Sequence, residues 1–100
     1  MNSAVRKLIT IITESSLEND LAEDVKRLGA HGYTVTEARG EGSRGSRSGD
    51  WDQSSNIRME VICESRVKDA ILQHLSERYY KDYAMVLYVA DVEVLRPEKF

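Results

Sequence analysis

The order in which two apolar periodicities follow each other is the strongest constraint on how this chain can fold. The segment 5–13 is rich in β-branched residues, and its stretch 8–12 is apolar on both faces, which is typical of a central strand. Strands are also predicted at 33–36, at 57–64, where apolar and polar residues alternate, and at 85–94, where the first half is apolar on both faces. Apolar residues at helical spacing fall between them in two sets: Leu17, Leu21, Val25 and Leu28, then Val67, Ile71, Leu75 and Tyr79.

This order of elements, βαββαβ, predicts an α+β fold of the ferredoxin-like kind with a four-stranded antiparallel sheet. The helix ends also carry signals. The segment 15–18 offers a capping box for the first helix, and Ser65 is expected to cap the second. Gly29 is expected to end the first helix, because glycine readily takes the left-handed backbone conformation found there.

Length and composition predict a single domain over residues 1–100. With 41% hydrophobic and 31% charged residues, the chain has the profile of a soluble globular protein, and its formal net charge of −3 argues against a general nucleic-acid binder. The only cysteine, Cys63, excludes an internal disulfide and is expected to be a packed thiol in a protein of the cytoplasm. No metal site is predicted, because His31 and His74 lie on different elements without ligand spacing around them.

The long segment at about 40–56 is the feature that a ferredoxin-like fold does not require. It joins two strands that a short turn could connect, and connections of this length are usually functional or disordered. Its first half is rich in glycine, serine and arginine, the groups that surround a phosphate through backbone N–H, hydroxyl and guanidinium donors. A phosphate ligand and a solvated insertion without a ligand are both compatible with this composition.

Two well-known nucleotide motifs do not account for the segment. Residues 40–45 match G-x-G-x-x-G after a strand, but no apolar helical period follows them, which argues against a dinucleotide-binding fold. The Gly-Lys-Ser/Thr triplet of a phosphate-binding P-loop is missing from the chain. An RNA-recognition module is also disfavoured, because the strand at 57–64 lacks the aromatic residues with which such modules stack bases.

Two segments of the chain form a recognisable combination: Gly-Ala-His-Gly-Tyr-Thr-Val at 29–35 and Gly-Glu-Gly-Ser-Arg-Gly-Ser-Arg-Ser at 40–48. In these segments the chain resembles the SbtB-type PII-like signalling proteins, and the resemblance covers nearly its whole length. It continues through 56–61, the Tyr-Tyr-Lys-Asp-Tyr turn at 79–83 and the ending at 93–100. The carboxysome-associated PII-like proteins are a similar group. The Cys-Gly-Pro-x-Gly-Cys ending of some relatives is missing, so redox control of that form is not expected.

The resemblance implies a homotrimer that binds adenine nucleotides (AMP, cyclic AMP, ADP or ATP) in clefts between subunits, with 40–56 serving as the T-loop that reports the ligand state. It implies that Arg44 and Arg47 hold phosphate. The other residues that it assigns to the nucleotide site are loop residues Gly40, Gly42 and Ser43, with Gly32 and Thr34, and Leu87, Tyr88 and Val89 from the adjoining subunit.

The function implied is regulatory. Such proteins act in bicarbonate uptake, with a sodium-dependent bicarbonate transporter or a carboxysome component as partner and with bicarbonate as a possible further ligand. No catalytic residue, metal or cofactor is expected, and no insertion into a membrane. The alternative is an enzyme, a slow nucleotide phosphohydrolase, for which the loop offers phosphate-binding groups but the chain offers no positioned base or nucleophile.

Overall fold

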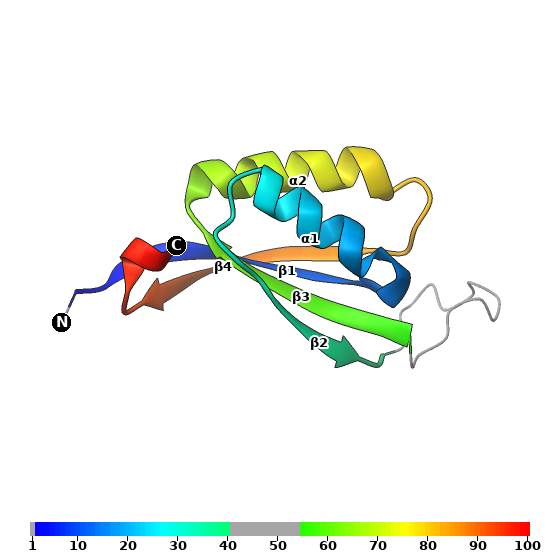
Figure 1. Cartoon of the computed structure of the whole chain (residues 1–100), viewed down its shortest axis with the longest axis horizontal. Coiled ribbons are helices and arrows are strands. Elements are labelled where there is room, and N and C mark those ends of the chain that lie inside the picture. Colours follow the sequence, from blue (N-terminus) through cyan, green and yellow to red (C-terminus); the bar gives the residue numbers. More distant parts are fainter. Residues whose placement is uncertain (1, 41–54) are drawn as a thin grey trace.

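Residues 2–40 and 55–100 are described by the computed structural model of the chain (Figure 1), which confirms the predicted order of strands and helices. Its regular elements are β1 (Ala4–Glu14), the 3-10 turn η1 (Ser15–Leu17), α1 (Glu18–Arg27), β2 (Thr34–Ala38), β3 (Asn56–Cys63), α2 (Ser65–Tyr79), β4 (Val86–Val94) and the 3-10 turn η3 (Pro97–Lys99). Within the described residues, neither helix is long and apolar enough to span a membrane.

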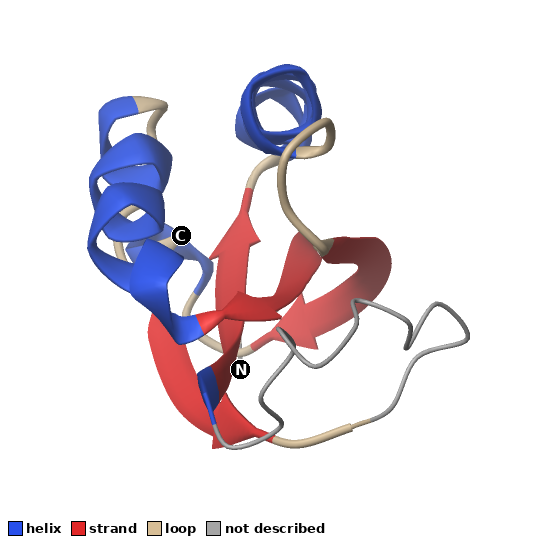
Figure 2. Cartoon of the chain, turned by 90° about the vertical axis from the view of Figure 1, so that its right-hand side faces the viewer, coloured by secondary structure: helices blue, strands red, loops and turns tan. Residues whose placement is uncertain are grey.

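The four strands form one antiparallel sheet in the order β2-β3-β1-β4. The long apolar strand β1 lies in the middle, as its sequence predicts, and its last pairs are Glu14 with Asn56 of β3 and Ile12 with Val86 of β4. Both helices pack on the same face of the sheet (Figure 2). The core lies between the helices and the sheet and includes Ile9, Ile11, Met59, Val61, Leu21, Val25, Ile71 and Leu75.

The other face of the sheet has no helix over it, and this changes the interpretation of the last strand. The sequence predicts the first half of β4 to be apolar on both faces. In the structure β4 is an edge strand, and Val86 and Tyr88 are 53% and 50% exposed. On the helix side of the strand Leu87 is partly buried and packs against the core, whereas Val86 and Tyr88 on the other side are not covered within one chain.

The predicted N-terminal caps of both helices are wrong, whereas the predicted end of α1 at Gly29 is confirmed. Neither Leu17, the N-cap of α1, nor Glu64, the N-cap of α2, makes a side-chain capping bond, so the predicted capping box at 15–18 and the predicted cap at Ser65 are wrong. The residues at 15–17 form η1 instead, and Ser65 is already the first helical residue of α2.

Gly29 ends α1 as predicted, in a Schellman motif. Its φ of 119° lies in the left-handed region, its N–H donates to the Lys26 carbonyl at 3.1 Å, and the Ala30 N–H donates to the Val25 carbonyl at 2.9 Å. A Cβ on Gly29 would also meet Val67 Cγ2 at 3.1 Å. The chain can therefore leave the helix sharply and enter β2, which begins at Thr34, one residue later than predicted.

A buried carboxylate joins the two helices. Asp24 of α1 is 4% exposed and accepts a hydrogen bond from the Tyr79 hydroxyl of α2 at 2.7 Å. Guanidinium nitrogens of Arg27 and Arg78 lie 3.3 Å from its other oxygen. Burial and the bond to Asp24 raise the pKa of Tyr79, so this hydroxyl remains a donor. Periodicity places Tyr79 in the core correctly but does not predict its polar partner.

Replacing Tyr79 with phenylalanine should lower the free energy of unfolding by about 1–3 kcal/mol, because Asp24 would lose a buried donor. Urea denaturation monitored by circular dichroism measures the change. Tyr80→Phe is the matched control, because Tyr80 is 50% exposed, and its effect should stay within about 0.5 kcal/mol. Equal stability of the two variants would contradict this role for the Tyr79 hydroxyl.

Candidate functional site

The long loop leaves the sheet and re-enters it at the same end of the sheet. β2 finishes at Ala38, which pairs with Asn56, the first residue of β3. Asn56 in turn pairs with Glu14, the last residue of β1, and β4 starts beside this end at Val86. The end of the sheet that carries the loop therefore comprises the ends of β1 and β2 and the starts of β3 and β4 (Figure 1).

The sequence-predicted site residues fall into three groups. Gly32, Thr34 and Gly40 flank or begin β2, and Leu87, Tyr88 and Val89 lie in β4. The remaining residues, Gly42, Ser43, Arg44 and Arg47, lie outside the described residues. The structure therefore places the residues expected to border the base and ribose, while the residues expected to hold phosphate stay a prediction.

Thr34 and Tyr88 lie in one row that crosses the whole sheet. The register pairs Thr34 with Glu60, Glu60 with Thr10, and Thr10 with Tyr88. The next row contains the core residues Met59 and Ile11, and side chains alternate between faces along a strand. Thr34 and Tyr88 therefore point to the face that the helices leave uncovered.

These two residues are at opposite edges of the sheet. Three strand spacings separate β2 from β4, which corresponds to about 14 Å. Leu87 belongs to the neighbouring row and packs against the core under the helices, and Val89 shares that side with 37% exposure. A single chain therefore does not bring the β2 residues and the β4 residues together around one ligand.

The two described glycines of the candidate site border open space. A Cβ built on Gly32 or on Gly40 meets no heavy atom within 4 Å, and neither residue has the positive φ that would demand glycine. Packing and backbone conformation in the described part of one chain therefore do not require glycine at either position. A group that approaches the backbone closely from outside the chain would have room at both.

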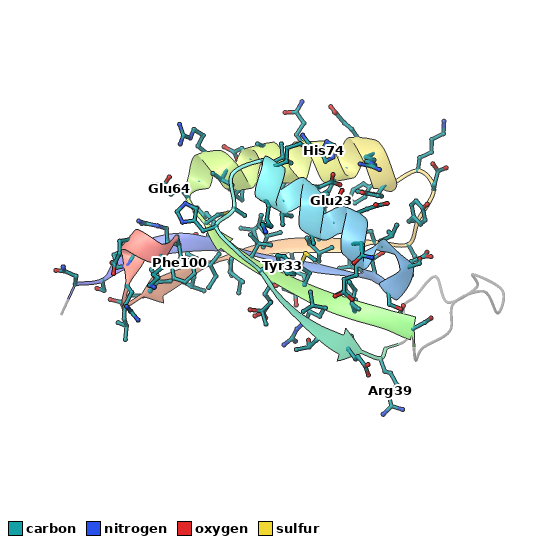
Figure 3. All side chains as sticks on the ribbon, in the orientation of Figure 1. Glu23, Tyr33, Arg39, Glu64, His74 and Phe100 are labelled. Carbon is teal, nitrogen blue, oxygen red and sulfur yellow. The ribbon has the colours of Figure 1, made fainter. Side chains whose placement is uncertain are left out.

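Two arginines near the loop were not among the predicted site residues. Arg39 follows β2 directly, and Figure 3 shows its side chain directed away from the sheet. Arg58 lies on the uncovered face, is 48% exposed, and has a nitrogen 3.6 Å from Glu60. The alternation in β3 assigns Arg58 to the polar face, so that pattern could have identified it. Both add positive charge at the loop-bearing end.

The residues that invite a catalytic interpretation are engaged elsewhere. His31 Nδ1 lies 3.0 Å from the Lys99 carbonyl, and His74 Nε2 lies 3.4 Å from Asp24. Within ranges 2–40 and 55–100, no group of three His, Cys, Asp or Glu residues is arranged to hold a metal ion. Cys63 is 2% exposed, and burial raises the pKa of its thiol, so it is the predicted packed residue.

Cys63 should therefore react with a disulfide reagent such as DTNB at pH 8 far more slowly than a free thiol. A raised pKa leaves less thiolate, which is the reactive form, and burial blocks access to it. The measurement compares the native protein with the protein in concentrated guanidinium chloride, where one thiol per chain should react rapidly. Rapid reaction in the native state would contradict the buried placement.

A sequence model of the family described as nitrogen regulatory protein P-II matches residues 6–99. The chain is also similar to a putative PII-like signalling protein from Thermus thermophilus, with 54% identity and a TM-score of 0.86. That match covers 100% of this chain and 99% of the other.

The fold is shared with more distant solved structures of CPII from Thiomonas intermedia. CPII bound to ADP and bicarbonate is 24% identical, with a TM-score of 0.84 over 99% of this chain and 97% of that one. CPII bound to ADP, AMP and bicarbonate is 22% identical, with a TM-score of 0.83 over 99% and 96%.

Proposed function

The chain belongs to the nitrogen regulatory protein P-II family, and from this membership we propose that it signals by binding adenine nucleotides between the subunits of a homotrimer. The observation that carries the proposal is the placement of Thr34 and Tyr88 in one row of the sheet but at opposite edges. Residues so far apart in one chain can border the same ligand when the β4 edge of a neighbouring subunit approaches the β2 edge.

The uncovered face of the sheet supports assembly into an oligomer. On the β1 and β4 half of this face, side chains such as Leu8, Ile12, Val86 and Tyr88 have no helix over them, and Val86 and Tyr88 are about half exposed. Burial of apolar surface stabilises by about 25 cal/mol per Å². A chain of 100 residues has a small core of its own, so covering this face with other subunits would add substantially to its stability.

The proposed nucleotide site has a phosphate end and a base end. Arg44 and Arg47, with Gly40, Gly42 and Ser43, hold the phosphate groups, because guanidinium and backbone N–H donors suit phosphate oxygens. Gly32 and Thr34 border the base and ribose, with Leu87, Tyr88 and Val89 of the adjoining subunit. The space above Gly32 and Gly40 and the positive charge of Arg39 and Arg58 support this arrangement.

The signalling role proposed is control of inorganic-carbon uptake through the T-loop at about 40–56. Support comes from the CPII structures, which contain ADP, AMP and bicarbonate, and from the loop sequence. Bicarbonate is the proposed second ligand, and a sodium-dependent bicarbonate transporter or a carboxysome component is the proposed partner. Nucleotide binding acts as a switch if it favours one loop conformation over another.

Isothermal titration calorimetry should show binding of ADP to the wild-type protein, and Arg44→Ala and Arg47→Ala should each weaken it by about 10- to 100-fold. Each variant loses a charge-assisted bond to phosphate, which contributes about 1.5–3 kcal/mol. Arg66→Ala, at an exposed position in the first turn of α2, is the control and should bind as the wild type does. No binding of AMP, cyclic AMP, ADP or ATP, with or without bicarbonate, would refute the proposed function.

The proposed assembly predicts that Tyr88→Glu disrupts the trimer, because it places a charge on a face that other subunits would bury. Tyr80→Glu is the matched control, since Tyr80 has the same 50% exposure but lies at the end of α2. Size-exclusion chromatography with light scattering measures the mass. A trimer of unchanged stability for both variants, or a monomeric wild type, would contradict assembly through the uncovered face.

A further inference from the structure

The η3 turn links the two edges of the sheet. It follows β4, which is one edge strand, yet its Lys99 carbonyl lies 3.0 Å from Nδ1 of His31, which comes just before β2, the opposite edge strand. Between these two points, the guanidinium group of Arg6 in β1 donates to the Pro97 carbonyl at 3.3 Å. The segment after β4 therefore crosses the sheet at the end opposite the long loop (Figure 1).

The acceptor that η3 offers to His31 is held by the backbone of the turn. The Lys99 N–H donates to the Arg96 carbonyl at 3.0 Å, and the Phe100 N–H donates to the Pro97 carbonyl at 3.0 Å. Proline also restricts its own φ angle, which limits the conformations open to the turn. The Lys99 carbonyl is thus a fixed acceptor.

The segment 31–33, which leads into β2, has few other contacts to hold it. Ala30, directly before it, is 7% exposed and is held in place by burial. After that point, a Cβ built on Gly32 meets no heavy atom within 4 Å, and Tyr33 is 41% exposed. Within the described residues, His31 is the only one of the three whose side chain makes a hydrogen bond. Its contact with η3 is therefore the anchor of this segment.

The partner of His31 determines which ring nitrogen carries the hydrogen. A carbonyl oxygen only accepts, so Nδ1 of His31 is the donor to Lys99. Because Nδ1–H is present in this neutral tautomer and in the protonated ring, the bond does not require one charge state. An asparagine side chain carries its amide nitrogen at about the position of Nδ1, so it can keep the donor.

We propose that His31 is a positioning residue for the base end of the nucleotide site: its bond to η3 fixes the segment that contains Gly32 and leads into Thr34. This inference rests on the proposed function, in which these two residues border the base and ribose. Fixing them before the ligand arrives lowers the conformational entropy that binding costs. His31 itself makes no contact with the nucleotide, so loss of its bond should weaken adenosine and ADP by the same factor.

The test uses calorimetry on the full-length protein, with ADP titrated directly and adenosine, which lacks phosphate, measured by competition against ADP. His31→Ala should weaken both ligands by about two- to fivefold, the lower part of the range for one hydrogen bond, because the contact is exposed. His31→Asn keeps a donor and should restore most of the affinity. Glu98→Ala is the matched control, because it removes an exposed side chain from the same turn and leaves the Lys99 carbonyl in place.

Hydrogen exchange provides a second readout that needs no ligand. In His31→Ala the amides at the start of β2 should exchange faster than in the wild type, while His31→Asn and Glu98→Ala should keep the wild-type rates there. Amides at the centre of β1 should not change in any variant, which also shows that His31→Ala is folded. Unchanged exchange at the start of β2 in His31→Ala would overturn the positioning role.

The outcomes separate this inference from the function on which it rests. If the wild type binds ADP and His31→Ala binds both ligands equally well, the positioning role is overturned and the proposed function stands. If His31→Ala weakens ADP but not adenosine, the effect lies at the phosphate end, which also overturns the positioning role. If the wild type binds no adenylate, the proposed function fails, and the positioning role fails with it.

Discussion

The pairing of β1 with two neighbours at once is the constraint on which the rest of the structure depends. β3 and β4 are both placed by β1, and β2 is placed by β3, so an error in the register of β1 would move every strand. A one-residue slip would also exchange Ile9 and Ile11 for Leu8 and Thr10 on the covered face. Because β1 is apolar on both faces, the same strand that builds the core also contributes apolar side chains to the face that the helices leave uncovered.

The helices are held over the sheet by packing and by one buried polar contact. Asp24, Tyr79 and the two arginines fix α1 against α2, while the Schellman turn at Gly29 directs the chain into β2. At the opposite end of the sheet, Thr13 and Ser15 hold the segments that enter β4 and β3. The helix layer is thus fixed by a carboxylate, and the loop-bearing end of the sheet by one hydroxyl group of the central strand and one of the turn that follows it.

Most of the fold could be predicted from the sequence, because apolar periodicity in 5–13, 57–63 and 65–79 reports directly which residues are buried. The starts of the helices could not be predicted. Ser15 and Ser65 are good capping residues by type, but the Ser15 hydroxyl donates to the Ser55 carbonyl, and Ser65 is already the first helical residue of α2. The hydrogen bond from Tyr79 to Asp24 could not be predicted either, because periodicity does not say which polar atoms meet in the core. For the site, Thr34 and β4 were placed in correct strands, while Arg58 was missed although the alternation of β3 exposed it.

A crystal structure of the protein grown with saturating ADP would test the central claim most directly. The account predicts a trimer in which each adenine ring lies between the start of β2 in one subunit and residues 87–89 of β4 in its neighbour, with the phosphates next to the loop-bearing end. A nucleotide bound by the residues of one subunit alone, or an empty cleft between subunits, would contradict it.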